Sequence, residues 1–159
     1  MKNYWLCLWI GIAVWSLSGT VSAVVLRPID DSELIARSTH VSLSRVAKIE
    51  SFWKEGRILS WVKLVPLRVY RGGSASVRIL VPGGTVDNLT QVVPGAPSFE
   101  IGSQALYFLE PLPKSDGYRL VGFSHGVVTR HQAVRFERLW TRLNLGLPTS
   151  SPEVLEHSK

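Results

Sequence analysis

The chain has 159 residues, with 18 lysines and arginines against 12 aspartates and glutamates, and a net charge of +6. This length fits one domain whose core can be stable without cross-links. The single cysteine, Cys7, excludes a disulfide framework and a zinc site built on cysteines.

The N-terminal segment has the pattern of an export signal. Lys2 precedes an uncharged apolar run from Tyr4 to about Leu17, and the small residues Val21 and Ala23 stand where a signal peptidase cleaves. We therefore expect residues 1–23 to be a cleaved signal peptide and the rest to be periplasmic or secreted. The alternative is an uncleaved membrane anchor, because the uncharged run is long enough to span a bilayer. The polar residues in its second half favour cleavage.

A short helix is expected next, over residues 30–37. Asp30 can cap the open N–H groups of its first turn while Glu33 returns the bond. The apolar period then changes to two, which predicts a strand from Val41 to Trp53 with a bulge near Arg45.

A turn at residues 54–57 leads into a second long strand, 58–70, in which Pro66 requires an edge position or another bulge. The remaining elements are short, and the region rich in Gly and Pro, 82–104, predicts an ordered loop. In chain order we expect strands at 77–81, 85–93 (a short pairing), 105–109, 118–123 and 126–130, with a turn at 113–117.

The C-terminal segment allows two interpretations. Phe136, Leu139 and Trp140 fall at helical spacing, whereas Val134 and Phe136 could extend a hairpin. Residues 147–159 are expected to form a polar, flexible tail.

Six to seven short strands without a βα alternation predict an all-β fold with minor helix content, either a small OB-like barrel or a meander. One domain over residues 24–146 is expected, and closure into a barrel would protect the strand edges.

Turn motifs and strand patterns over residues 30–130 resemble a family of small exported bacterial proteins of uncharacterised function. The motifs are Ser51-Phe52-Trp53, Gly56-Arg57-Ile58, Val69-Tyr70-Arg71-Gly72, Val81-Pro82-Gly83-Gly84, Val93-Pro94-Gly95-Ala96-Pro97-Ser98-Phe99, Leu106-Tyr107-Phe108-Leu109 and Gly122-Phe123-Ser124-His125-Gly126. The resemblance implies export and a β-rich domain, and it implies no catalytic residue. A looser similarity links the strand order to the OB-like inhibitor domains of netrins and metalloproteinase inhibitors. Their zinc-binding N-terminal cysteine has no equivalent after residue 23.

No group of residues has a strong catalytic or metal-binding pattern, and we expect no catalytic residue, metal or cofactor. His125, His131 and Glu137 could share one face of a strand, but a turn at His131 breaks that geometry. Ser124, His125 and Asp116 lack a nucleophile elbow, and adjacent Ser and His point to opposite faces of a strand.

We therefore expect an exported, non-enzymatic binding domain with an unidentified protein or envelope partner. The loop 82–104 is the expected surface, with Val92, Val93 and Phe99 as anchors, because an ordered loop loses little entropy on binding. The alternative is a small hydrolase, or an accessory or inhibitory subunit of an exported protease, with polar groups converging only in the fold.

The basic charge has its own alternatives. Outside the cytoplasm the available polyanions are lipid head groups, cell-wall polymers and acidic glycans, so nucleic acid is not an expected partner. A charge excess spread along the chain is typical of a solvated surface. Membrane contact is expected only through the signal segment or the C-terminal helix, where Arg135, Arg138, Trp140 and Arg142 suit a membrane surface. The competing interpretation is that this helix packs on the barrel.

Overall fold

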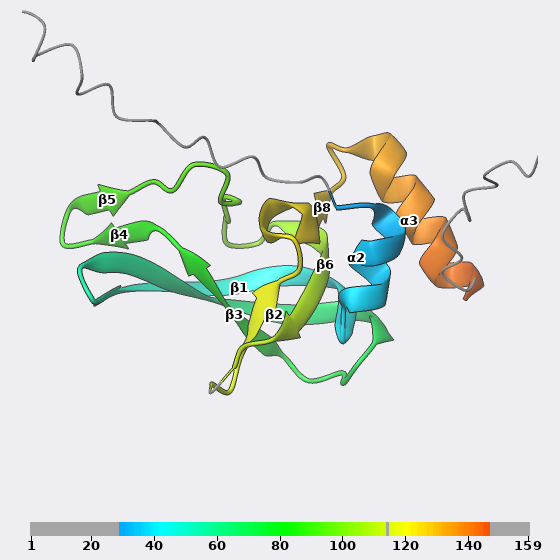
Figure 1. Ribbon diagram of the computed structural model, residues 1–159, viewed down its shortest axis with the longest axis horizontal. Helices are drawn as coiled ribbons and strands as arrows, with labels where there is room; N and C mark the ends of the chain where they lie inside the picture. Colours follow the sequence, from blue (N-terminus) through cyan, green and yellow to red (C-terminus); the bar gives the residue numbers. More distant parts are fainter. Residues whose placement is uncertain (1–28, 114, 147–159) are drawn as a thin grey trace, which may run out of the picture.

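The computed structural model describes residues 29–113 and 115–146 (Figure 1). The predicted signal segment and the predicted tail lie outside these residues. The elements in chain order are α2 (Asp31–Arg37), β1 (His40–Lys54), β2 (Arg57–Arg71), β3 (Val77–Pro82), β4 (Gly84–Val86), β5 (Leu89–Gln91), β6 (Gln104–Pro111), β7 (Tyr118–Leu120), the 3-10 helix η1 (Phe123–Gly126), β8 (Val127–Thr129) and α3 (Ala133–Leu145).

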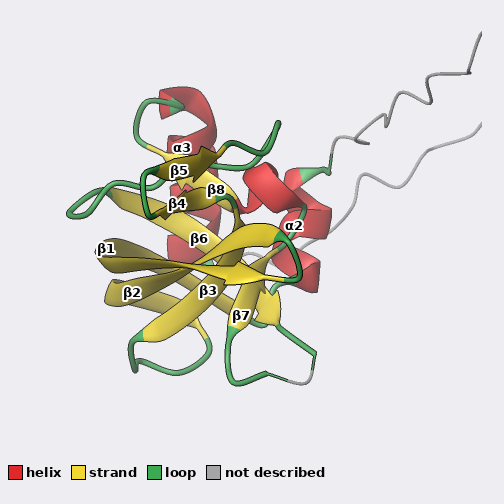
Figure 2. Ribbon diagram, turned by 90° about the vertical axis from the view of Figure 1, so that its left-hand side faces the viewer, coloured by secondary structure: helices red, strands yellow, loops and turns green. Residues whose placement is uncertain are grey.

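Five of the strands close into a barrel (Figure 2). β1, β2 and β3 form an antiparallel meander, β3 continues to β7, β7 pairs with β6, and β6 returns to β1. The step from β3 to β7 is parallel, with Ile79 beside Tyr118, so the barrel is mixed. β8 extends the sheet beside β6, and β4 and β5 form a separate hairpin. The expected fold class, a mostly-β barrel, is therefore confirmed.

The long β1–β2 hairpin follows the sequence closely. Its turn has positive φ angles at Glu55 (49°) and Gly56 (74°), as a two-residue type I′ turn requires. The register between the strands shifts at three places, and the second and third lie on either side of Arg45, where a bulge was predicted. Pro66 pairs with Ser44 beside the second shift, which is one of its two predicted settings.

The first part of β1, residues 40–44, is buried on both faces, and each face belongs to a different layer. Val41 and Leu43 point out of the barrel into a cluster with α2 and α3. Their neighbours His40, Ser42 and Ser44 point inward. The hydrophobic residues buried in the interior are Val46, Val62, Leu64, Ile79, Val81, Ala105, Tyr107, Leu109, Leu120 and Val127.

The two helices lie together at one end of the molecule, and the β4–β5 hairpin lies at the other (Figure 1). In α2, Asp30 accepts the predicted capping bond from the Ser32 N–H at 3.1 Å. The structure contains no return bond from Glu33. That carboxylate instead meets Arg37 one turn later, at 3.4 Å.

The C-terminal segment forms the helix α3 and does not extend a hairpin, so the first of its two interpretations is confirmed. Phe136 and Leu139 are buried against the outward face of the barrel, together with Leu106 and Phe108. Trp140 is half-buried and meets the Tyr70 ring edge-on at 5.8 Å between centroids. The apolar stripe of this helix is therefore part of the core.

Candidate functional site

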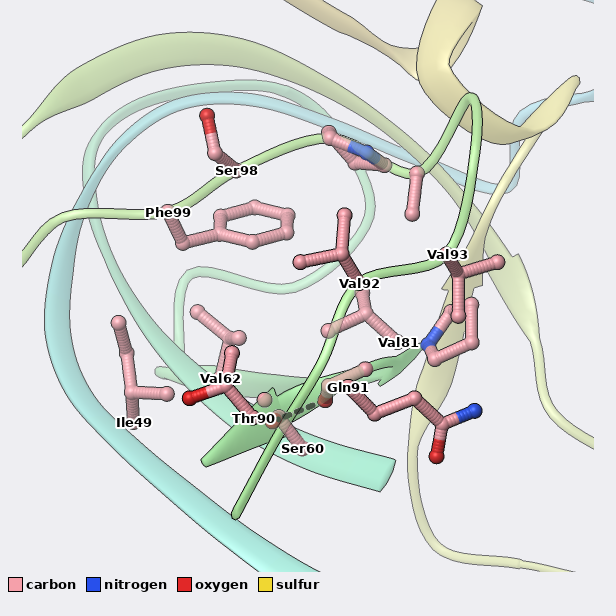
Figure 3. Close-up of a pocket in the computed structure, with 15 residues that line it drawn as sticks. Ile49, Ser60, Val62, Val81, Thr90, Gln91, Val92, Val93, Ser98 and Phe99 are labelled. Atoms are coloured by element: carbon pink, nitrogen blue, oxygen red, sulfur yellow. Dashed lines mark hydrogen bonds between the residues drawn. The ribbon is translucent and has the colours of Figure 1, made fainter. Parts of the chain in front are cut away.

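A groove of about 240 Å³ lies between the β1–β2–β3 sheet and the segment that follows β5. Its floor contains Ile49, Val62 and Val81, and Val92 and Phe99 stand across from them (Figure 3). The predicted anchor Val93 lines the same groove. The structure thus brings the three sequence-predicted binding residues to one place.

The sheet fixes the near end of this groove through polar side chains. The Ser60 hydroxyl donates to the Gly83 carbonyl at 2.7 Å, and the hydroxyls of Ser51 and Ser60 are 2.8 Å apart. The Gln91 side chain accepts from the Ile58 N–H at 2.7 Å. Gly84 fits closely against both serines, where a Cβ atom would collide with them. The segment after β5 therefore starts from a fixed position.

Phe99 fixes the far end. Its ring stacks on Tyr107 with centroids 6.5 Å apart and planes 15° apart, and it packs against the barrel interior. Just beyond it, the Gly102 N–H donates to the Val46 carbonyl at 2.8 Å. Phe99 thus lies over the end of the barrel, and its replacement would disturb the core as well as the groove. Val92 is different, because its side chain is 82% exposed.

The groove has no ionisable side chain in its lining, and its polar atoms come from residues such as Thr90, Gln91 and Ser98. A lining of this kind can remove an apolar group from water and can hydrogen-bond to a neighbouring backbone. It supplies no acid, base or nucleophilic pair.

The residues considered for metal binding or hydrolysis lie elsewhere. His125 is in η1, with its ring Nδ1 3.2 Å from the Gly122 carbonyl oxygen, while Asp116 is in the turn before β7. His131 precedes α3, and Glu137 is on its exposed face. Within residues 29–113 and 115–146, no three His, Cys, Asp or Glu side chains are placed to hold a metal ion.

A buried polar chain inside the barrel was missed from the sequence. The His40 Nε2 atom is 3.2 Å from the Ser42 hydroxyl, which is 2.8 Å from the Ser44 hydroxyl. Burial lowers the pKa of His40 below its usual value of 6.5. None of the three side chains lines the groove, so the geometry fits a neutral hydrogen-bonded chain in the core.

The predicted membrane-surface residues are placed on α3. Arg135 pairs with the buried Asp31 carboxylate at 2.9 Å, and Arg138 approaches it at 3.5 Å. Trp140 packs on Tyr70, while Arg142 is exposed. Among the residues that the structure describes, no helix has the length and apolar character needed to cross a membrane.

No protein-family model matches the chain, and no curated protein matches it either. Its function is therefore inferred from its own geometry.

Proposed function

We propose that this protein is a non-enzymatic binding domain whose groove takes one apolar side chain from an extended segment of a protein partner. The observation that carries the proposal is the uncharged groove of about 240 Å³ between the sheet and residues 90–99. Val62 and Val81 at its floor belong to the barrel core, so the floor is rigid.

The size of the groove favours a side chain over a whole small molecule. Sites for drug-sized ligands and cofactors typically have volumes of about 300–1,000 Å³, and this groove is smaller. An apolar anchor in a well-packed pocket is how a few residues supply most of the binding energy of a protein interface. Ser98 offers a polar group beside it for the backbone of the same partner segment.

Residues 90–99, which form one wall of the groove, are already fixed at both ends. The Gln91 side chain is hydrogen-bonded to Ile58 at one end, and Phe99 packs on Tyr107 at the other. Binding therefore orders little additional chain, and the entropic cost is correspondingly low. Val92, which is 82% exposed, supplies the part of the wall that a partner can reach from solvent.

We also propose that the barrel is of the OB kind and that the chain belongs to the small exported bacterial proteins that it resembles. The five-strand order β1-β2-β3-β7-β6, closed by β1, supports the first proposal. Export to the periplasm or the medium is supported by the charge, apolar run and small residues of positions 1–23. An envelope or secreted protein is the corresponding partner class.

The proposal is tested by selecting peptides from a displayed library against the purified protein. Selected peptides should share one large apolar residue flanked by polar ones, and they should shift the NMR signals of Val62, Val92 and Phe99. Failure to select any such peptide, or shifts confined to another surface, would contradict the proposal.

Val92→Glu should weaken binding of a selected peptide by about tenfold or more, because it places a charge against an apolar anchor. Ile101→Glu is the matched control, since Ile101 is 69% exposed in the same connection and does not line the groove. Isothermal titration measures both. Equal losses in the two variants would show that added negative charge, and not the groove, controls binding.

A further inference from the structure

The outer face of the barrel carries a row of cations across three strands. Lys48 on β1 pairs in register with Lys63 on β2, which pairs with Arg78 on β3. Directly paired residues point to the same side of a sheet, so these three side chains stand next to one another. All three are exposed. Arg45 of β1 is exposed on the same face, and it pairs with Val65, two residues after Lys63 on β2.

This arrangement opposes stability, because like charges directly opposite in a sheet repel each other. Part of the repulsion is offset within the protein. The Lys48 ammonium is 2.6 Å from the Glu50 carboxylate, and the Arg78 Nε–H donates to the Asp116 carbonyl at 2.9 Å. Lys63, at the centre of the row, forms no ion pair within the described part of the chain. Local violations of this kind are typical of functional surfaces.

A hollow of about 530 Å³ lies beside the row of cations. It supports a binding role for this face independently of the charges. Trp61 and Tyr118 supply its aromatic walls, and Lys63 and Arg78 supply its charge. The Arg78 guanidinium covers the Trp61 ring at 4.6 Å from the centroid. Gly117 lies so close to the same ring that a Cβ atom there would be 2.8 Å from it. The indole is therefore held rigidly in the wall.

The carboxylates at the hollow indicate which kind of anion fits. Glu50 and Asp116 line it together with the two cations. A carboxylate accepts hydrogen bonds from hydroxyl groups, and it repels any anionic group that is placed directly against it. A ligand that carries both hydroxyls and negative charges satisfies all four groups. Aromatic residues commonly bind single-stranded nucleic acid by stacking on its bases. Arg78 covers one face of the Trp61 ring, so a base cannot stack there, which disfavours nucleic acid as the ligand.

We propose that this outer face, with Lys63 at its centre, binds an acidic polysaccharide, that is, a sugar chain bearing carboxylates. The site is separate from the groove, whose lining faces the other side of the β1–β2–β3 sheet. The cations Lys48, Lys63 and Arg78 bind the carboxylates of the polymer, and Glu50 and Asp116 accept its hydroxyls.

Binding of polygalacturonate to the purified protein, measured by isothermal titration at low salt, tests this proposal. The wild-type protein should bind it saturably and should not bind its uncharged methyl ester. Lys63→Gln should lower the affinity by about tenfold, since it removes one charge-assisted contact, and Lys63→Arg should retain the affinity.

Arg142→Gln provides the control, because it removes one exposed positive charge from α3, away from the row. Its affinity should stay within about twofold of the wild-type value, as expected for a distant screened charge. Equal losses in Lys63→Gln and Arg142→Gln would overturn the site and indicate a general charge effect. Absence of saturable binding, or equal binding of single-stranded poly(dT), would overturn the assignment to an acidic sugar chain.

Discussion

Replacing Gly126 by alanine is expected to lower the free energy of unfolding by about 2–3 kcal/mol. A Cβ atom at this position would lie 2.6 Å from the Val121 carbonyl oxygen and 3.0 Å from that of Phe108. Both are backbone atoms, and the Val121 N–H donates to the Phe108 carbonyl at 3.0 Å. The added methyl group can therefore fit only if η1 moves away from the backbone of β6 and of Val121. Urea denaturation of the variant measures the loss.

Gly73→Ala is the matched control for this substitution. No heavy atom lies within 4 Å of a Cβ built on Gly73, and its φ angle is not in the left-handed region. Its stability should remain within about 0.5 kcal/mol of the wild-type value. A Gly126→Ala protein as stable as Gly73→Ala would show that Gly126 is not packed as closely against Phe108 and Val121 as described.

Acidification is expected to destabilise the protein through His40. Because burial lowers the pKa of His40 below 6.5, the unfolded chain binds this proton at a higher pH than the folded chain does. The free energy of unfolding should therefore fall as the pH drops below about 6.5. The slope can reach about 1.4 kcal/mol per pH unit while only the unfolded chain carries the proton. The loss stops growing once the pH is below the folded pKa.

Denaturation between pH 7 and pH 5 measures this slope, and two variants assign it. His40→Gln keeps a hydrogen-bonding group beside Ser42 but has no titrating ring, so its slope should be shallower. His131→Gln, on an exposed turn, should keep the wild-type slope. If His40→Gln loses stability with acid as steeply as the wild type, the proton is bound elsewhere.

Local signals were sufficient for most individual elements. Asp30 marked the start of α2, Gly56 lies in the hairpin turn, and Pro66 lies beside a register shift. Each depends on a residue and its near neighbours, which is the information a sequence displays directly. The parallel contact of Ile79 with Tyr118 depends on chain closure instead, and no local pattern indicated it.

The polar chain His40–Ser42–Ser44 was missed for a related reason. The alternating apolar residues Val41 and Leu43 indicate that one face of the strand is buried, and they do not indicate whether the polar residues between them face solvent or a second layer. The helices α2 and α3 cover that apolar face, and the barrel encloses the other one. Whether a strand is covered on one side or on two is decided by elements far away in the sequence.

The two surfaces proposed here differ in how far the sequence could indicate them. Val92, Val93 and Phe99 are close in sequence, and a Pro- and Gly-rich loop is a common place for binding residues. The sequence did not indicate that this loop folds over the end of the barrel through the stacking of Phe99 on Tyr107. The row Lys48–Lys63–Arg78 appears only once both strand registers are known, since its members are far apart in the chain.

Together, the groove and the cation row would give one small domain two partners on opposite sides of a single sheet. A domain with this arrangement would bring an apolar protein segment close to an acidic polymer. Val92→Glu and Lys63→Gln each change one of the two sites. If their effects on the binding free energies add in the double variant, the two sites act independently.

Intermolecular nuclear Overhauser effects in a complex with a selected peptide test the proposed groove most directly. The apolar side chain of the peptide should show contacts to the methyl groups of Val62 and Val81 and to the ring of Phe99. Contacts to α3 or to the outer face of β1–β3, without any to these three residues, would contradict the proposal.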